Sequence, residues 1–257
     1  MGGALLRGWR ERGLAQRYVV VEPGPGGGEF AGNRDVTLAA AAEALPPELR
    51  PGAIVLAVKP QAMATVLPAY RRFVADDVLV LSIAAGKTLG FFARQLGDRA
   101  AVVRAMPNTP AAIGRGIAVL CANAAVGKTQ RHRAEALLAA VGEVAWVEDQ
   151  ALLDAVTAVS GSGPAYVFLL IECLTAAAIA EGLPAELALR LARATVAGAG
   201  ELARRSSEPP ARLRENVTSP GGTTRAALDV LMGTGGLEPL LRRAVRAATE
   251  RSRQLAD

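Results

Sequence analysis

The sequence predicts an α/β fold in which a doubly wound N-terminal domain is followed by an all-helical C-terminal domain. Over the first 150 residues, short apolar runs bounded by turn residues alternate with segments of helical composition. Continuous apolar runs of this kind are typical of strands covered on both faces, as in a parallel sheet with crossover helices. Beyond residue 150 every segment indicates helix and none indicates strand. We therefore expect one domain over 1–150 and a second over 151–257.

The first domain is expected to contain six strands. They are Tyr18–Glu22, Ala53–Val58, Val78–Ile83, Val102–Met106, Ile117–Leu120 and Val144–Val147. Helices are expected between them, at Ala62–Phe73 and Lys128–Val141. The Gly- and Pro-rich stretch Pro23–Gly28 is expected to be a flexible loop after the first strand.

The second domain is expected to consist of helices alone. They are Leu152–Val159, Gly163–Glu181, Pro184–Arg204, Pro209–Asn216, Thr223–Met232 and Leu237–Leu255. Prolines near several helix starts and glycines at helix ends support these bounds, because proline fits the first turn and glycine fits the residue after the last.

The composition excludes several classes of function. The formal charge of +5 comes from 29 basic and 24 acidic residues that are interspersed along the chain, a pattern typical of solvated faces rather than nucleic-acid binding. The longest apolar run, Ala165–Ala180, is interrupted by Glu172 and is too short to span a membrane. We expect it to be buried in a core or between subunits.

Cysteine and histidine are scarce. Cys121 and Cys173 lie far apart in apolar runs, which indicates reduced core residues in a reducing cytoplasm. No Cys/His spacing indicates a metal. The single histidine, His132, lies between two arginines and is expected at the surface. A His-dependent dehydrogenase or a Ser-His-Asp hydrolase is therefore hard to build from this chain.

The first residues, Met1-Gly2-Gly3-Ala4-Leu5, look like the end of a Gly-x-Gly-x-x-Gly fingerprint that runs into a helix. In a dinucleotide-binding domain a strand and two further glycines come first, and the helix N-terminus then meets the pyrophosphate. We expect that strand to be missing from the middle of the sheet, which leaves its two neighbours unpaired. A misassigned start codon and a truncated protein are the two explanations, and the intact later segments favour the first.

The most informative segment is Leu213–Leu231, which contains the turn Ser219-Pro220-Gly221-Gly222 followed by Thr223-Thr224. Two glycines before a helix let the backbone aim several free N–H groups at one point, and the helix N-terminus adds partial positive charge. This arrangement suits a carboxylate. The alternative is an ordinary connection between helices with Thr223 or Thr224 as N-cap.

The segment closely resembles the C-terminal signature of the pyrroline-5-carboxylate reductases, and earlier segments resemble the same family in the same order. These segments are Gly2–Gly3, Ala57–Gln61, Ser82–Gly86, Val103–Pro110 and Ala158–Tyr166. The resemblance implies a Rossmann-type first domain and a helical second domain that binds substrate and dimerises. It also implies a homodimer in the cytoplasm, with assembly into a larger oligomer left open.

The resemblance further implies which residues form the site. The substrate-binding residues would be Asn216, Ser219, Gly221, Gly222, Thr223 and Thr224, with the Thr224 hydroxyl facing the ring nitrogen as the catalytic group. The cofactor-binding residues would be Gly2, Gly3, Ala57, Val58, Lys59, Pro60, Ala84, Ala85 and Asn108. No metal, nucleic acid or membrane is implied.

The implied reaction is reduction of 1-pyrroline-5-carboxylate to L-proline by NADPH or NADH. Glu22 at the end of a strand favours NADH, because an acid there repels a 2′-phosphate. Arg34 in the following loop favours NADPH, and the resemblance does so too, because many members of the family prefer NADPH. Both cofactors are therefore retained. Two alternatives stay open: a non-catalytic homologue that lacks the cofactor cradle, and a related imine or β-hydroxyacid reductase. The absence of any lysine after Lys128 counts against the latter, because those enzymes use a lysine as proton donor.

Overall fold

The computed structural model describes residues 1–255, which form two compact units. The first unit contains Met1–Gly161 together with the chain from Ala248 onward, and the second contains Ser162–Ala247. Residues 256–257, the end of the expected second domain, lie outside the described residues. The functional boundary near residue 150 stays a prediction.

The first unit contains a five-stranded sheet in the order β3-β4-β5-β6-β7. Its strands are β3 (Ala53–Leu56), β4 (Leu79–Ser82), β5 (Ala101–Met106), β6 (Gly116–Ala122) and β7 (Gly142–Trp146). The expected α/β class is confirmed and the sheet is mostly parallel, but β6 runs antiparallel to β5. These two strands are joined by a short connection with one 3-10 turn, Thr109–Ile113, and a connection without a crossover helix reverses the chain.

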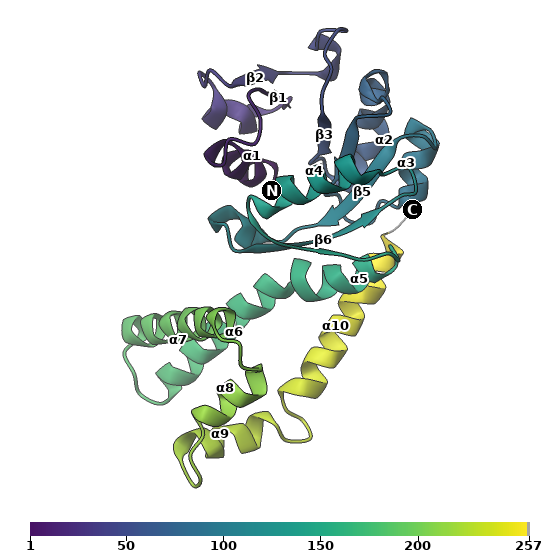
Figure 1. Cartoon of the computed structure of the whole chain (residues 1–257). Helices are drawn as coiled ribbons and strands as arrows, with labels where there is room; N and C mark the ends of the chain where they lie inside the picture. Colours follow the sequence, from purple (N-terminus) through teal and green to yellow (C-terminus); the bar gives the residue numbers. More distant parts are fainter. Residues whose placement is uncertain (256–257) are drawn as a thin grey trace. The chain divides into compact units, whose positions relative to one another are not determined.

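A separate two-stranded sheet consists of β1 (Tyr18–Val21) and β2 (Val36–Ala39), and it stands apart from β3 in Figure 1. The sequence reading missed β2, a short and partly exposed edge strand. Within the described residues β1 pairs only with β2 and β3 only with β4, all in parallel. Each of these two sheets therefore has a strand edge without a partner.

Side chains of β1 and β3 nevertheless pack against the same two cores. One core takes Tyr18, Val20, Ala53 and Val55, and the other takes Val21, Ile54 and Leu56. Because alternate residues of both strands face the same two cores, β1 and β3 are parts of one layer with an open slot between them. Within the described residues, β1 and β3 are not paired with each other across this slot.

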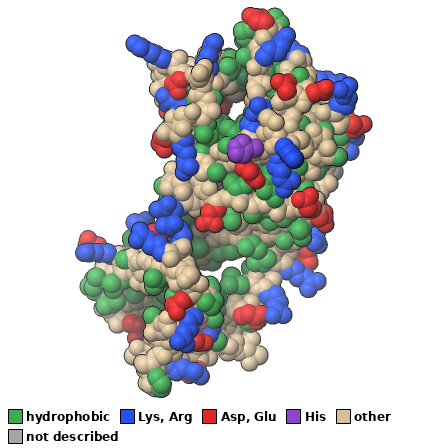
Figure 2. Space-filling view, viewed as in Figure 1, with side chains coloured by type: hydrophobic (Ala, Val, Ile, Leu, Met, Phe, Trp, Pro, Cys, Tyr) green, Lys and Arg blue, Asp and Glu red, His purple; other side chains and the backbone are tan. Residues whose placement is uncertain are grey.

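Five α-helices of the first unit accompany the sheet. They are α1 (Gly2–Glu11), α2 (Met63–Val66), α3 (Leu89–Leu96), α4 (Lys128–Ala139) and α5 (Leu152–Val156). The α1 helix is anchored on α4, where Trp9 Nε1 donates to the Leu137 carbonyl at 2.6 Å. His132 lies exposed on α4, as expected, and is visible as the purple side chain in Figure 2.

Two expectations for this unit need correction. The expected helix over 62–73 is mostly 3-10, with only Met63–Val66 in α conformation, because Pro60 and Pro68 interrupt the backbone hydrogen bonding. The stretch expected as a flexible loop forms a 3-10 helix, Pro25–Phe30. Its buried Phe30 anchors this helix in the core.

The helices of the second unit follow the predicted pattern closely. They are α6 (Gly163–Ala180), α7 (Ala185–Arg205), α8 (Pro210–Asn216), α9 (Thr223–Leu231) and α10 (Leu237–Gln254), whose last residues belong to the first unit. Ser162 is the N-cap residue of α6 but makes no side-chain cap hydrogen bond, and Ser160 donates to the Val156 carbonyl at 3.1 Å.

The α6 helix buries none of its residues within the chain, although it is apolar on every face. Cys173 is accordingly exposed on α6, which corrects the expectation that both cysteines are core residues, whereas Cys121 is buried. By length and composition alone, Leu152–Ala180 would suffice to cross a membrane. The same property is found in helices that pack between subunits.

Candidate active site

The N-terminus of α1 meets the carboxyl end of β3. A Cβ placed on Gly2 would lie 3.1 Å from the Cβ of Ala57, so the two backbones are in close approach. The first backbone hydrogen bond of the helix is Leu5 N–H to the Met1 carbonyl, and within residues 1–255 the N–H groups of Gly2, Gly3 and Ala4 make none. These open N–H groups and the helix dipole favour an anion.

A cavity of about 400 Å³ opens beside this helix start. It is lined by Met1, Gly3, Ala4, Arg7, Gly26, Glu29, Thr109 and Ala112. Of the predicted cofactor residues only Gly3 lines it. A Cβ on Gly3 would lie 2.9 Å from Glu29 Oε1, so a larger residue here would have to displace the end of this exposed side chain. Glu29 also accepts a hydrogen bond from Arg7 Nη1 at 2.6 Å, which brings a cation to the cavity.

The predicted loop after β3 is positioned by Pro60 and by the core. Val58 packs into the core, Lys59 is exposed, and Pro60 begins a 3-10 turn. Ala57 is the residue of this loop that faces Gly2.

The loop after β4 is the second predicted cofactor segment. Ser82 is buried and its Oγ accepts a hydrogen bond from the Ala84 N–H at 3.3 Å. Gly86 has a φ of 77°, a conformation that L side chains rarely adopt, and it turns the chain toward α3. Ala84 is buried and Ala85 is half-buried, so the backbone of this loop rather than its side chains is available to a ligand.

Asn108 and Glu22 hold local structure. Asn108 Oδ1 accepts the Ile117 N–H at 3.0 Å, and its carbonyl accepts the Ala111 N–H. Glu22 Oε1 accepts the Gly24 N–H at 3.0 Å. These bonds fix the ends of β5 and β1 at the edge where α/β sheets bind ligands.

Sequence reasoning missed a buried arginine at this edge. Arg104 on β5 is only 9% exposed, and its Nη1 donates to Gln150 Oε1 at 3.0 Å. The same oxygen accepts the Leu89 N–H at the start of α3, also at 3.0 Å. Burial lowers the pKa of Arg104, while the charge of Asp154 opposes this change. A charged residue in the middle of an apolar strand was the signal that could have found it.

The predicted substrate turn lies between α8 and α9. Gly221 has a φ of 70°, and the Gly222 N–H donates to the Ser219 carbonyl at 3.1 Å, which closes the turn. The first hydrogen bond of α9 is Ala226 N–H to the Gly222 carbonyl. Within the described chain, the N–H groups of Thr223, Thr224 and Arg225 have no backbone partner. Three N–H groups at one helix start can grip a carboxylate.

The side chains around this turn differ in exposure and in hydrogen bonding. Thr224 is half-buried and Thr223 is exposed, and neither caps the helix, because the N-cap residue is Gly222. The suggestion that a threonine is the N-cap is therefore wrong. Asn216 ends α8 and donates from Nδ2 to Glu208 at 3.1 Å, so its amide is engaged with another side chain.

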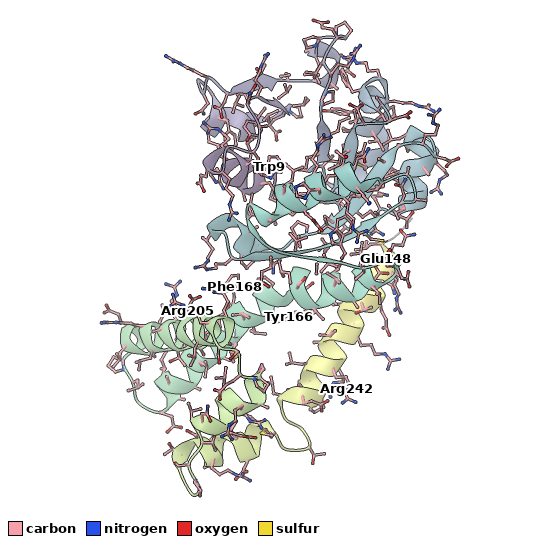
Figure 3. The ribbon with its side chains drawn as sticks, viewed as in Figure 1. Trp9, Glu148, Tyr166, Phe168, Arg205 and Arg242 are labelled. Carbon is pink, nitrogen blue, oxygen red and sulfur yellow. The ribbon has the colours of Figure 1, made fainter. Side chains whose placement is uncertain are left out.

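A further apolar feature of the second unit is a groove of about 1000 Å³. Its lining residues come from α8, α9 and α10 and are Arg214, Leu228, Leu231, Met232, Leu237, Glu238, Leu241, Arg242, Val245 and Arg246. Figure 3 labels Arg242 on α10. A groove lined mainly by apolar side chains together with some charged ones is typical of a surface that another chain covers.

Comparison with known proteins decides the family. The region 150–255 matches the model for the pyrroline-5-carboxylate reductase dimerisation domain. The pyrroline-5-carboxylate reductase of Haemophilus influenzae is 35% identical over 257 residues, which cover 99% of this chain and 94% of the relative. This chain belongs to the pyrroline-5-carboxylate reductase family.

Other members of the family agree. The pyrroline-5-carboxylate reductase of Pseudomonas aeruginosa is 47% identical over 79% of this chain and 74% of its own. The structure of the Coxiella burnetii enzyme matches with a TM-score of 0.91 and 34% identity, covering 100% of this chain and 95% of that one. The Plasmodium falciparum enzyme, solved with NADP bound, matches with a TM-score of 0.83 and 29% identity over 100% of this chain and 95% of that one.

More distant matches show the fold alone. A prephenate dehydrogenase from Aquifex aeolicus is 15% identical with a TM-score of 0.51, covering 99% of this chain and 92% of that one. The reductase family and its dimerisation domain thus confirm the predicted Rossmann-type and helical organisation.

Proposed function

We propose that this chain reduces 1-pyrroline-5-carboxylate to L-proline, with NADPH or NADH as the hydride donor. The observation that carries the proposal is the Ser219–Thr224 turn, in which three unpartnered N–H groups and a half-buried threonine hydroxyl stand together in a member of this family. The substrate has a matching pair of groups, because it is a cyclic imine that bears a carboxylate.

The reaction does not require a strong general acid from the protein. The imine nitrogen takes up a proton from water, and the resulting iminium carbon accepts hydride, so that the proton and the hydride together give the amine. The N–H groups of Thr223 and its neighbours would bind the carboxylate, and the Thr224 hydroxyl would orient the ring nitrogen. His132 is therefore not needed, which agrees with its exposed place on α4.

The first unit supplies groups that fit a dinucleotide. The open N–H groups at the start of α1, the guanidinium of Arg7 and the side-chain-free Gly3 suit a diphosphate, which needs donors, positive charge and close backbone approach. The loops that contain Ala57 and Ala84 would bind the rest of the cofactor with their backbones. When bound, NADPH or NADH supplies the hydride.

The proposal includes a homodimer located in the cytoplasm. The dimerisation model over 150–255 and the exposed apolar residues of α6 support the dimer. Figure 2 shows hydrophobic side chains gathered on the helical unit. Both cysteines are free thiols, which agrees with a reducing compartment.

The test is an assay of NADPH and NADH oxidation with pyrroline-5-carboxylate, in which L-proline is quantified. It should be run on the chain as given and on a version extended by an apolar strand and Gly-x-Gly before Met1. We expect proline to form in proportion to the cofactor oxidised. A protein that binds the cofactor but forms no proline would contradict the proposal.

A further inference from the structure

The buried guanidinium of Arg104 is not explained by the reaction. Its Nε has no hydrogen-bond partner within the described residues, and no carboxylate lies within ion-pair distance there. Asp154, the acid whose charge acts on it, accepts a hydrogen bond from Ser252 Oγ at 2.7 Å instead. Burying a cation without an ion pair costs free energy, so stability alone does not account for Arg104.

The Arg104 guanidinium donates a hydrogen bond to one side-chain atom, Gln150 Oε1. This oxygen receives two donors at 3.0 Å each, Arg104 Nη1 from β5 and the Leu89 N–H from α3. These groups are 46 and 61 residues from Gln150 along the chain, so the glutamine bridges elements that are distant in sequence. The guanidinium also fixes which atom of the amide faces Leu89, because it can only donate and therefore selects the oxygen.

The bridge closes one end of the loop after β4. Leu89 is the first residue of α3, and its N–H is one of those that a helix leaves without a partner. The neighbouring Thr88 caps the same turn by accepting the Phe91 N–H at 3.1 Å. The other end of the loop is fixed by Ser82 on β4. A loop anchored at both ends holds its backbone in one place, although Gly86 would otherwise let it move.

We propose that Arg104 and Gln150 are positioning residues, which fix the start of α3 and thereby hold the Ile83–Thr88 loop ready for the dinucleotide. The proposal rests on the proposed function only in assigning this loop to the cofactor. Two of the N–H groups at the start of α3, those of Leu89 and Phe91, are occupied by Gln150 and Thr88, so this helix start is engaged in ordering the loop.

The test compares Gln150→Ala with Gln150→Glu and Arg104→Met in the full chain. Hydrogen exchange of the backbone over residues 83–92 is measured without ligand, and NADPH affinity and the two KM values are measured separately. In Gln150→Ala we expect exchange at Leu89 to rise about tenfold, which corresponds to the loss of one buried hydrogen bond. The KM for NADPH should rise by a similar factor, whereas the KM for pyrroline-5-carboxylate should stay within about twofold.

The other variants separate positioning from mere stability. Gln150→Glu keeps an oxygen for both donors and should stay within about threefold of wild type in exchange and affinity. Arg104→Met should retain thermal stability, because apolar replacement of a buried charge is often neutral, and yet loosen the loop. The matched control is Gln130→Ala, since Gln130 is a buried glutamine on α4 that donates to the Asp76 carbonyl at 2.9 Å. It should lower stability without changing residues 83–92.

Unchanged exchange over 83–92 in Gln150→Ala would overturn the proposal, as would an equal change in Gln130→Ala. The exchange measurement needs neither cofactor nor substrate. A wild-type protein that makes no proline would therefore refute the proposed function, while the exchange result still decides whether the bridge orders the loop.

Discussion

The backbone of Gly2 lies so close to Ala57 that a Cβ on the glycine would come within 3.1 Å of the alanine Cβ. This contact joins the start of α1 to the end of β3, although the two residues belong to different segments of the chain. It places the open N–H groups of α1 beside a loop that the family resemblance assigns to the cofactor. The approach is tighter than an ordinary van der Waals contact, so a larger residue at position 2 would have to displace α1 or Ala57.

Gly2→Val is expected to weaken NADPH binding about tenfold and to lower the free energy of unfolding by about 1 kcal/mol, because the added methyl groups force α1 away from β3. Cofactor titration and urea unfolding measure the two effects. The matched control is Gly52→Val at the opposite end of β3, where a Cβ would make an ordinary contact of 3.6 Å with Arg133. Equal effects in both variants would show that the α1 contact has no special role.

The slot between β1 and β3 makes a second prediction. An apolar strand placed before Met1, as long as the four-residue strands that flank the slot, should pair with both free edges. We expect the extended chain to be more stable by about 2 kcal/mol or more, after the cost of ordering the strand. Urea unfolding and NADPH titration test this.

The control extension has the same length but carries proline at alternate positions, because proline cannot donate to a strand pair. It should give no gain. If the apolar and the proline extensions behave alike, the slot does not accept a strand.

The sequence predicted the elements well where one local pattern decides them. Five apolar runs matched the strands of the main sheet, and the helices of the second unit began and ended near their glycines and prolines. The strand β2 was missed because its four residues are half-exposed and lack a continuous apolar run. The reversed direction of β6 was missed because strand direction depends on the connection, which between Met106 and Gly116 forms only a short 3-10 turn and no crossover α-helix.

The candidate site, too, could be predicted only where its residues are adjacent in the sequence. The Ser219–Thr224 turn could be predicted because its glycines and hydroxyls are adjacent in the sequence. The bridge from Arg104 through Gln150 to Leu89 could not, because its members come from three segments that only the fold brings together. The exposure of Cys173 was also unpredictable, since an apolar helix gives no sign of whether its own chain or another covers it.

Thr224→Ala is expected to lower kcat about tenfold or more and to leave the fold intact, because the hydroxyl is proposed to orient the ring nitrogen in the transition state. Steady-state kinetics and thermal unfolding measure this. Thr224→Ser keeps the hydroxyl and should retain most of the activity. Thr223→Ala, at the exposed neighbouring position, should alter kcat far less. A well-folded Thr224→Ala protein with wild-type kcat would remove this residue from the chemistry.

Gly221→Ala should destabilise the turn because of its φ of 70°, and not because of crowding, since a Cβ there would meet no atom within 4 Å. The expected cost is about 1–2 kcal/mol, together with a higher KM for pyrroline-5-carboxylate. Gly221→Asn should be milder, because asparagine tolerates this conformation better. Gly235→Ala is the control, since that glycine also has free space but no strained φ. If urea unfolding shows the same loss of stability in Gly221→Ala and Gly235→Ala, the conformational argument is contradicted.

The exposed apolar face of α6 makes the last prediction. Phe168 is 59% exposed on this helix and is labelled in Figure 3. If the face packs against a second copy, Phe168→Glu places an unpaired charge in the interface, and the dissociation constant should rise by about a hundredfold or more. Analytical ultracentrifugation over a range of concentrations measures it. Ile113→Glu is the control, because Ile113 is 77% exposed in the first unit. Unaltered self-association in Phe168→Glu would place the dimer contact away from this part of α6.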